Sequence, residues 1–407
     1  MERLEDFARR KPLAFAAFLG FAALTLRLSL ADLAARIVGI ETRDLSLFYD
    51  GLSYIYIAKS FPRVYIGAPA DFPIFYKPVG FTAFFAFYPL LIRAVDFLLH
   101  DARIAALSVS QLSASLAVVV FHRLACRFSA RPALAALIFC VFPPTWLLTG
   151  SAAMVESVFL LVWLACLLFW KKGELSKAAA CAAVAMLTQK SGFLLVAIIA
   201  LCEFRRGGLR GLRRLWPFAL SFAPAALMQV YLGAVFHDPW VSFRIMSDIN
   251  GPAFQLPFQG FMEGLLSPTQ WYHGHFWLRK FLLASSCIFY VLLLAAAWRR
   301  RARLEFSLIA WLGVVLLFHG SLGGIRSYFP FPKYMTAAAP AAILLALELL
   351  PAALARRSAV WTGLLIAWIP AVLALGAMDI FSAMDLELRM WPRGYFQIVT
   401  SYLAGLH

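Results

Sequence analysis

Long apolar runs separated by short basic clusters most restrict how this chain folds. Several of them reach the roughly 20 residues that a helix needs to cross about 30 Å of hydrocarbon. With 62% hydrophobic and 14% charged residues and a mean hydropathy of +0.78, the chain is too apolar for a water-soluble surface. The runs are continuous rather than alternating, which disfavours an outer-membrane barrel. We therefore predict an all-α, polytopic integral membrane protein.

The basic residues indicate how the chain is oriented. A net charge of +16 would point to nucleic acid in a soluble protein, but these residues lie between apolar runs. The positive-inside rule explains them as cytoplasmic loops, so we expect the lipid bilayer and no nucleic acid as a partner. We predict a cytoplasmic N-terminus and about eleven transmembrane helices, of which 178–204 supplies two short ones broken at 188–192. The predicted spans are 12–38, 104–122, 132–148, 155–170, 178–204, 215–236, 279–298, 304–321, 335–355 and 358–377.

The segment 79–99 decides which loops lie outside. If it crosses the membrane, the basic clusters at 123–131 and 171–177 fall on the outer side, against the charge rule. We expect it to lie at the outer interface or dip into it, although the sequence leaves a full crossing open. The chain then forms one membrane domain over 1–407, with extracytoplasmic parts at 39–103, which carries interfacial helices, at 237–278 and in the tail 378–407.

This topology gathers most of the groups that chemistry needs on the outer side. They are the carboxylates Asp44, Asp50, Asp71, Glu156, Asp238, Asp248 and Glu263 and the cations Lys190, Arg326 and Lys333. The six cysteines lie in or beside apolar runs without metal-ligand spacing. We therefore expect no disulfide framework and no metal site.

Six short motifs carry a resemblance to a known family. They are Tyr49-Asp50-Gly51-Leu52-Ser53-Tyr54-Ile55-Tyr56-Ile57-Ala58, Phe87-Tyr88-Pro89-Leu90-Leu91-Ile92-Arg93, Phe142-Pro143-Pro144 followed by Glu156-Ser157, Leu187-Thr188-Gln189-Lys190-Ser191-Gly192, His237-Asp238-Pro239, and Lys333-Tyr334. In this order they resemble motifs of the PIG-V family of mannosyltransferases, within the GT-C glycosyltransferase superfamily. The chain departs from the family pattern at Tyr49, Ser53, Gln189-Lys190 and Lys333, which bears on substrate identity more than on reaction class.

The resemblance implies a GT-C-like glycosyltransferase. Such an enzyme moves a hexose, here expected to be mannose, from a polyprenyl-phosphate donor to a hydroxyl acceptor at the extracytoplasmic face, with inversion and without a metal or other cofactor. The acceptor would be a glycan, lipid or protein. Alanine- and arginine-rich composition favours a bacterial inner membrane. The sequence leaves the donor sugar, the acceptor, the linkage and the oligomeric state open.

The expected reaction needs a carboxylate that takes the proton of the acceptor hydroxyl. The matched motif favours Asp50 as this base, with Asp44 or Asp71 as alternatives. Asp50 could equally cap a helix that begins at Gly51, since aspartate is a preferred N-cap residue.

The reaction also needs a cation at the departing phosphate, where negative charge develops. We expect Lys333 in this role, with Arg326 and Lys190 as further phosphate ligands. Lysine acts on phosphate as a point charge, whereas arginine binds it in a bidentate manner. Lys333 and Arg326 could instead be interfacial residues that extend toward lipid headgroups.

Other outer residues are candidates for binding substrate. They are Asp71, Tyr54, Glu156, Asp238 and Asp44. Each has an ordinary alternative as a helix cap, a turn residue or an interfacial aromatic. A transporter or lipid flippase without transferase activity is the alternative function, and it predicts inverted repeats, which we do not find in the sequence.

Overall fold

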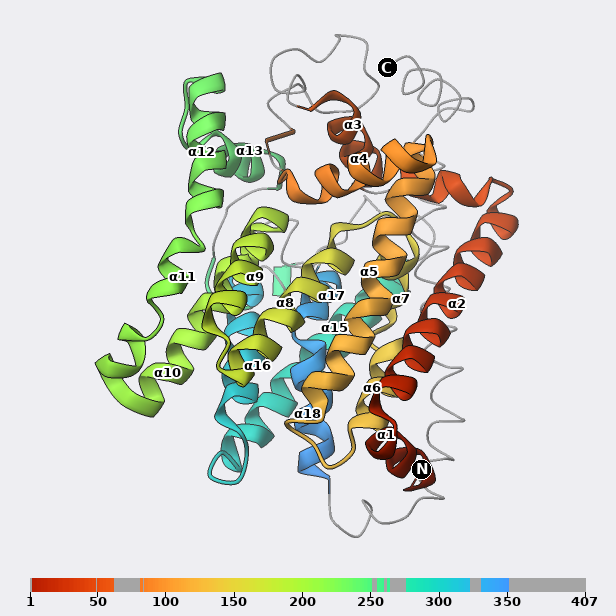
Figure 1. The fold of residues 1–407 in the computed structure, drawn as a ribbon. Helices are drawn as coiled ribbons and strands as arrows, with labels where there is room; N and C mark the ends of the chain where they lie inside the picture. Colours follow the sequence, from red (N-terminus) through yellow and green to blue (C-terminus); the bar gives the residue numbers. More distant parts are fainter. Residues whose placement is uncertain are drawn as a thin grey trace.

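The structure is a computed structural model that describes residues 2–48, 50–61, 81–82, 84–250, 255–259, 262–263, 276–322 and 331–350. The regular elements of this part of the chain are all helical, as predicted (Figure 1). The elements of the long bundle are α2 (Pro12–Val38), α5 (Ala102–Ala125), α6 (Pro132–Val141), α8 (Val155–Lys172), α9 (Leu175–Thr188), α10 (Phe193–Arg213), α15 (Phe276–Arg299), α16 (Phe306–Gly320) and α18 (Ala339–Leu349).

Shorter or more peripheral elements flank and connect these helices. They are α1 (Glu2–Arg10), η1 (Thr42–Leu47), α3 (Gly51–Ser60), α4 (Phe87–Leu99), α7 (Pro144–Ser151), η4 (Lys190–Gly192), α11 (Trp216–Leu220), α12 (Ala223–Phe236), α13 (Val241–Asn250), α17 (Phe331–Tyr334) and η6 (Met335–Ala337). The site described below is built from several of them.

Proline and glycine set several helix boundaries. Proline stands in the first turn of α2, α6 and α7, where a missing N–H costs no intrahelical bond. Gly39 and Gly173 end α2 and α8 with φ of 78° and 80°, a left-handed conformation that glycine adopts readily. The predicted span 132–148 is in fact two helices, α6 and α7, bent by 67° at a break that contains Pro143.

The helix positions agree with the sequence prediction better than the number of spans does. Within the described residues, three helices are long and apolar enough to cross a membrane, Pro12–Val38, Ala102–Ala125 and Trp216–Phe236, or four if the bent α6–α7 pair is one span. Shorter apolar helices lie within the predicted spans 178–204, 279–298, 304–321 and 335–355 or overlap them. The eleven predicted spans are therefore not confirmed as a number, and 358–377 and the tail 378–407 lie outside the described residues.

Polar contacts join the basic loops at one end of the bundle. Lys171, in the last turn of α8, lies 2.8 Å from Glu305, which precedes α16, and Arg206 in α10 lies 3.7 Å from the same carboxylate. Arg9 in α1 donates a hydrogen bond of 2.7 Å to the Ala130 carbonyl before α6. The basic clusters thus share one end, as the predicted topology requires.

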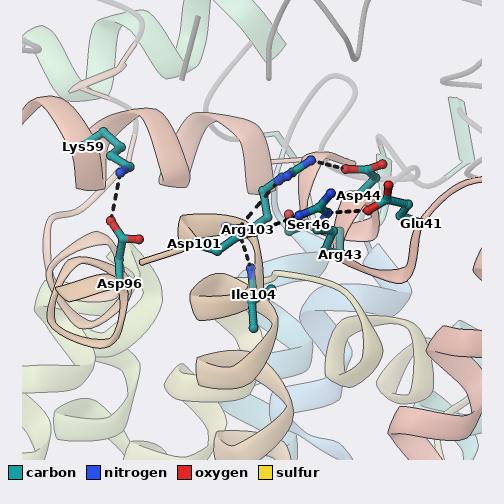
Figure 2. Close-up of polar contacts among 9 residues, drawn as sticks. All are labelled: Glu41, Arg43, Asp44, Ser46, Lys59, Asp96, Asp101, Arg103 and Ile104. Atoms are coloured by element: carbon teal, nitrogen blue, oxygen red, sulfur yellow. Dashed lines mark hydrogen bonds and ion pairs between the residues drawn. The ribbon is translucent and has the colours of Figure 1, made fainter. Parts of the chain in front are cut away.

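At the opposite end, α3 and α4 lie across the bundle rather than along it (Figure 1). The 13-residue helix α4 is ~20 Å long, shorter than the hydrocarbon core is thick. The interfacial position of 79–99 stays a prediction. Lys59 of α3 pairs with Asp96 of α4 at 3.2 Å (Figure 2), and the Tyr88 hydroxyl donates to the Ala106 carbonyl of α5 at 3.3 Å. These contacts attach α3 and α4, which we call the layer of short helices, to the bundle.

This topology makes a prediction about sidedness. A reporter that is active only outside the cytoplasm, fused after His100, should be active, whereas the same reporter fused after Ser129 should be silent. The reason is that α5 crosses between these positions and the basic residues hold the second one inside. A reporter active in the cytoplasm alone must give the opposite pattern, and activity of one reporter at both positions would contradict the topology.

Candidate active site

One lysine lies between two carboxylates at the end where α3 and α4 lie. The Lys333 Nζ is 3.2 Å from Asp50 Oδ2 and 3.0 Å from Glu156 Oε1. Lys333 belongs to α17, Glu156 to the first turn of α8, and Asp50 directly precedes α3. Lys333 and Asp50 are 283 positions apart in the sequence, so the fold brings the predicted base and the predicted phosphate ligand together.

Burial and charge act in opposite directions on Lys333. Burial alone lowers the pKa of this lysine, but the carboxylates of Glu156 and Asp50 outweigh it and raise the pKa well above the usual value. Because the pKa is raised, the ammonium group and its stabilising effect persist throughout the neutral range and are lost only at strongly alkaline pH. Lys333 therefore offers a fixed positive charge.

The two carboxylates differ in their access to solvent. The Asp50 side chain is 38% exposed, whereas that of Glu156 is 6% exposed. Asp50 stands at the N-cap position of α3, yet its side chain makes no capping hydrogen bond. Its carboxylate contacts Lys333 instead, so the capping role is not what the structure shows for this side chain.

Close packing around Gly51 fixes the position of Asp50. A Cβ atom at Gly51 would collide with the Ser46 carbonyl oxygen of η1 and would lie 3.2 Å from the Ala153 carbonyl oxygen. Only glycine allows the start of α3 to approach both backbones so closely. Ala153 precedes α8, so this contact also holds Asp50 beside the beginning of the helix that carries Glu156.

Hydrogen bonds hold the chain between α7 and α8. The Ser110 hydroxyl of α5 donates to the Met154 carbonyl at 2.9 Å, and the Ser157 hydroxyl donates to the Thr149 carbonyl at 2.9 Å. Glu156 lies between these anchors in the first turn of α8, where the helix dipole favours a negative charge. Sequence reasoning missed Ser110 and Gly51, because partners distant in the chain are not visible in a local pattern.

A small pocket adjoins the lysine. Its lining includes Lys333, Glu156, Gln189, Ser191 and His319. Asp50 is not among the residues that line the pocket. Among the described residues, no group of three or more His, Cys, Asp or Glu side chains could hold a metal ion.

Three other predicted site residues, Asp44, Asp238 and Lys190, have partners outside the lysine-centred cluster. Asp44 pairs with Arg103 at 2.6 Å (Figure 2). Asp238 pairs with Arg244 and accepts a hydrogen bond of 3.0 Å from the Trp240 backbone N–H, a turn contact.

Lys190 donates to the Ser242 carbonyl at 2.5 Å and lies near the ring of Phe243. In the sequence, Lys190 lies between the pocket-lining residues Gln189 and Ser191, while its ammonium group contacts α13.

The remaining candidates differ in what the structure shows of them. Tyr54 is 4% exposed and packs edge-on against Phe84 and Tyr88, with ring centroids 5.1 and 4.9 Å apart. Its ring is therefore part of the apolar packing under α3 rather than a platform for a sugar. Asp71 and Arg326 lie outside the described residues.

Comparisons with known proteins show the fold. No protein-family model matches the chain, and no curated protein matches its sequence. The crystal structure of ArnT from Cupriavidus metallidurans bound to undecaprenyl phosphate is similar over 92% of this chain and 76% of ArnT, with a TM-score of 0.51 and 15% identity. The chain shares the fold of ArnT. This agrees with the predicted all-α membrane fold, whereas the resemblance to the PIG-V family rests on the sequence motifs alone.

Two further solved structures are similar at a lower level. ArnT from the same organism in the apo state covers 82% of this chain and 71% of its own, with a TM-score of 0.41 and 19% identity. The archaeal oligosaccharyltransferase AglB from Archaeoglobus fulgidus, in complex with an inhibitory peptide and a dolichol-phosphate, covers 90% of this chain and 56% of its own. Its TM-score is 0.47 and its identity 12%.

The shared lysine makes a prediction about stability. Lys333→Met should destabilise the protein by ~3–5 kcal/mol, because it leaves the buried Glu156 carboxylate without its cation. Adding Glu156→Gln to Lys333→Met should recover part of this loss, since the double variant no longer buries an unpaired charge. Thermal unfolding of the purified full-length protein in detergent measures both changes.

The matched control for this experiment is a solvent-exposed ion pair. Asp6→Asn removes the pair with Arg10, whose side chains are 55% and 77% exposed, and should barely move the unfolding midpoint. If Lys333→Met unfolds at the same temperature as Asp6→Asn, the three-group cluster does not stabilise this end of the bundle.

Proposed function

We propose that this protein is a glycosyltransferase that moves a hexose from a polyprenyl-phosphate donor to a hydroxyl acceptor at the extracytoplasmic face. The observation that carries the proposal is the contact of Lys333 with both Asp50 and Glu156, in a chain with the fold of ArnT. A carboxylate and a cation within 3.2 Å supply the two groups that sugar transfer from a phosphate requires. The undecaprenyl phosphate bound to ArnT supports a lipid phosphate as the carrier.

The proposed reaction is a single displacement. The acceptor oxygen forms a bond to the anomeric carbon, the bond from that carbon to the phosphate oxygen breaks, and its electron pair leaves with the lipid phosphate. The hydroxyl proton passes to the Asp50 carboxylate, which makes the attacking oxygen a stronger nucleophile. The Lys333 ammonium group stabilises the charge that develops on the phosphate. Attack opposite the leaving group inverts the anomeric configuration.

Differences in burial divide the roles of the two carboxylates. Asp50, with 38% of its side chain exposed, can meet an acceptor that arrives from outside. Glu156 is buried and holds Lys333 from the bundle side, so it serves to orient the cation and to bind substrate. Asp44 is a weaker base candidate because Arg103 already neutralises it.

The finer parts of the proposal rest on the sequence motifs. The resemblance to the PIG-V family makes mannose the expected sugar, and a glycan, lipid or protein of the cell envelope the expected acceptor. Asp71 and Arg326 remain candidate ligands for the acceptor and the phosphate, with Lys190 as a further cation near the pocket. A bacterial inner membrane is the expected location.

Asp50→Asn should lower sugar transfer by ~10²–10⁴-fold, because an amide cannot accept the acceptor proton. The measurement uses membranes that contain the full-length variant, supplied with undecaprenyl-phosphate mannose that carries a radiolabelled sugar, and follows label in the envelope fraction. Asp44→Asn tests the alternative base and should cost far less, since Asp44 is engaged by Arg103.

Asp96→Asn is the matched control. Asp96 also lies in the layer of short helices and pairs with Lys59, but it is not part of the lysine-centred cluster. Full transfer by Asp50→Asn would remove Asp50 as the base. Absence of transfer by the wild-type protein from lipid-linked mannose and from lipid-linked glucose would favour a transporter or flippase.

A further inference from the structure

Three residues that line the pocket beside Lys333 each have a buried polar atom without a hydrogen-bond partner in the described part of the chain. The atoms are Glu156 Oε2, Ser191 Oγ and His319 Nδ1, and their residues belong to α8, η4 and α16. These three residues are 5%, 7% and 3% exposed. Leaving such an atom unpaired is costly, and most buried polar atoms in proteins are paired. Three in one pocket therefore point to a group that enters it.

The chemistry of these atoms defines that group. A carboxylate oxygen accepts hydrogen bonds, a serine hydroxyl both donates and accepts, and an imidazole nitrogen does either according to its tautomer. A sugar hydroxyl, which is both donor and acceptor, matches all three. The pocket has room for about one water-sized group, so it fits a single hydroxyl group rather than a whole sugar ring.

The position of the pocket identifies which substrate supplies the hydroxyl. Lys333 and Glu156 line the pocket. Asp50, which also contacts the Lys333 ammonium group, does not line it. In the proposed donor the sugar is joined directly to the phosphate that Lys333 binds, so a sugar substituent lies within reach of a pocket that shares this lysine. The acceptor instead has to approach Asp50.

We propose that Ser191, His319 and the free oxygen of Glu156 form a subsite for one hydroxyl group of the transferred sugar, which rests on the proposed function. The ring of His319 stacks on Tyr334, with centroids 4.9 Å apart and planes inclined by 15°, which restrains the plane of the imidazole. Phe159 and Leu160 of α8 supply an apolar wall, which excludes water and strengthens the polar contacts. The subsite would let the protein distinguish sugar-carrying from bare lipid phosphate.

The test compares two lipids on the purified full-length protein in detergent. The probes are undecaprenyl phosphate and undecaprenyl-phosphate hexose, the latter with mannose and with glucose. The wild-type protein should bind at least one sugar-carrying lipid more tightly than the bare phosphate. His319→Phe, which keeps an aromatic ring against Tyr334 but removes the nitrogens, and Ser191→Ala should each lose about tenfold of this preference. Their affinity for undecaprenyl phosphate should stay unchanged.

His122→Phe is the matched control, because His122 is also a buried histidine with an unpartnered Nδ1. It packs on Phe15 with ring centroids 4.9 Å apart, away from the pocket, so both affinities should stay at the wild-type level. Ser191→Ala, a small change, keeps the test decisive if His319→Phe does not fold.

The possible outcomes separate the two proposals. Wild-type preference for a sugar-carrying lipid that persists in both variants would mean that the pocket holds only water, while the proposed function stands. Equal wild-type affinity for all the lipids would also overturn the subsite. If the wild-type protein binds neither bare nor sugar-carrying lipid, the proposed function fails, and the subsite fails with it.

Discussion

The charge balance around Lys333 governs the rest of the site. Two carboxylates and one ammonium group carry a net negative charge, and Glu156 is held where water cannot solvate it well. Such a cluster persists only if its members keep their partners. In the proposed reaction, an incoming phosphate competes with Asp50 for the same lysine. Binding of the donor would therefore release the Asp50 carboxylate at the moment when a base is needed.

Backbone packing and a side-chain hydrogen bond position the elements that carry the cluster. The start of α3 lies against η1 and the chain before α8 because Gly51 has no side chain, and Ser110 holds the α7–α8 connection from α5. The layer of α3 and α4 is thus attached to the bundle through several independent contacts. Lys333 then has two carboxylates in fixed positions, and its own short helix has to supply only one side chain.

The sequence predicts the helices well and their contacts poorly. The apolar runs predicted α2 at 12–38 and the break at 188–192 between α9 and α10, as observed. Both features follow from local composition. The 67° bend between α6 and α7 was missed, although Pro143 marks it, since the flanking runs are equally apolar. The pairing of Asp50 with Lys333 followed from motif resemblance, while His319 went unnoticed even though a histidine inside an apolar run is costly without a purpose.

The fold alone does not decide which sugar the proposed enzyme would transfer, because this chain and ArnT share the fold at only 15% identity. Selectivity has to come from a few buried polar groups. A deoxy sugar, which lacks the hydroxyl, leaves the polar atoms of such a pocket unpaired. The pocket therefore rejects this sugar more strongly than a sugar that has an extra group elsewhere. The polar pocket beside Lys333 is therefore expected to discriminate against a missing hydroxyl rather than against size.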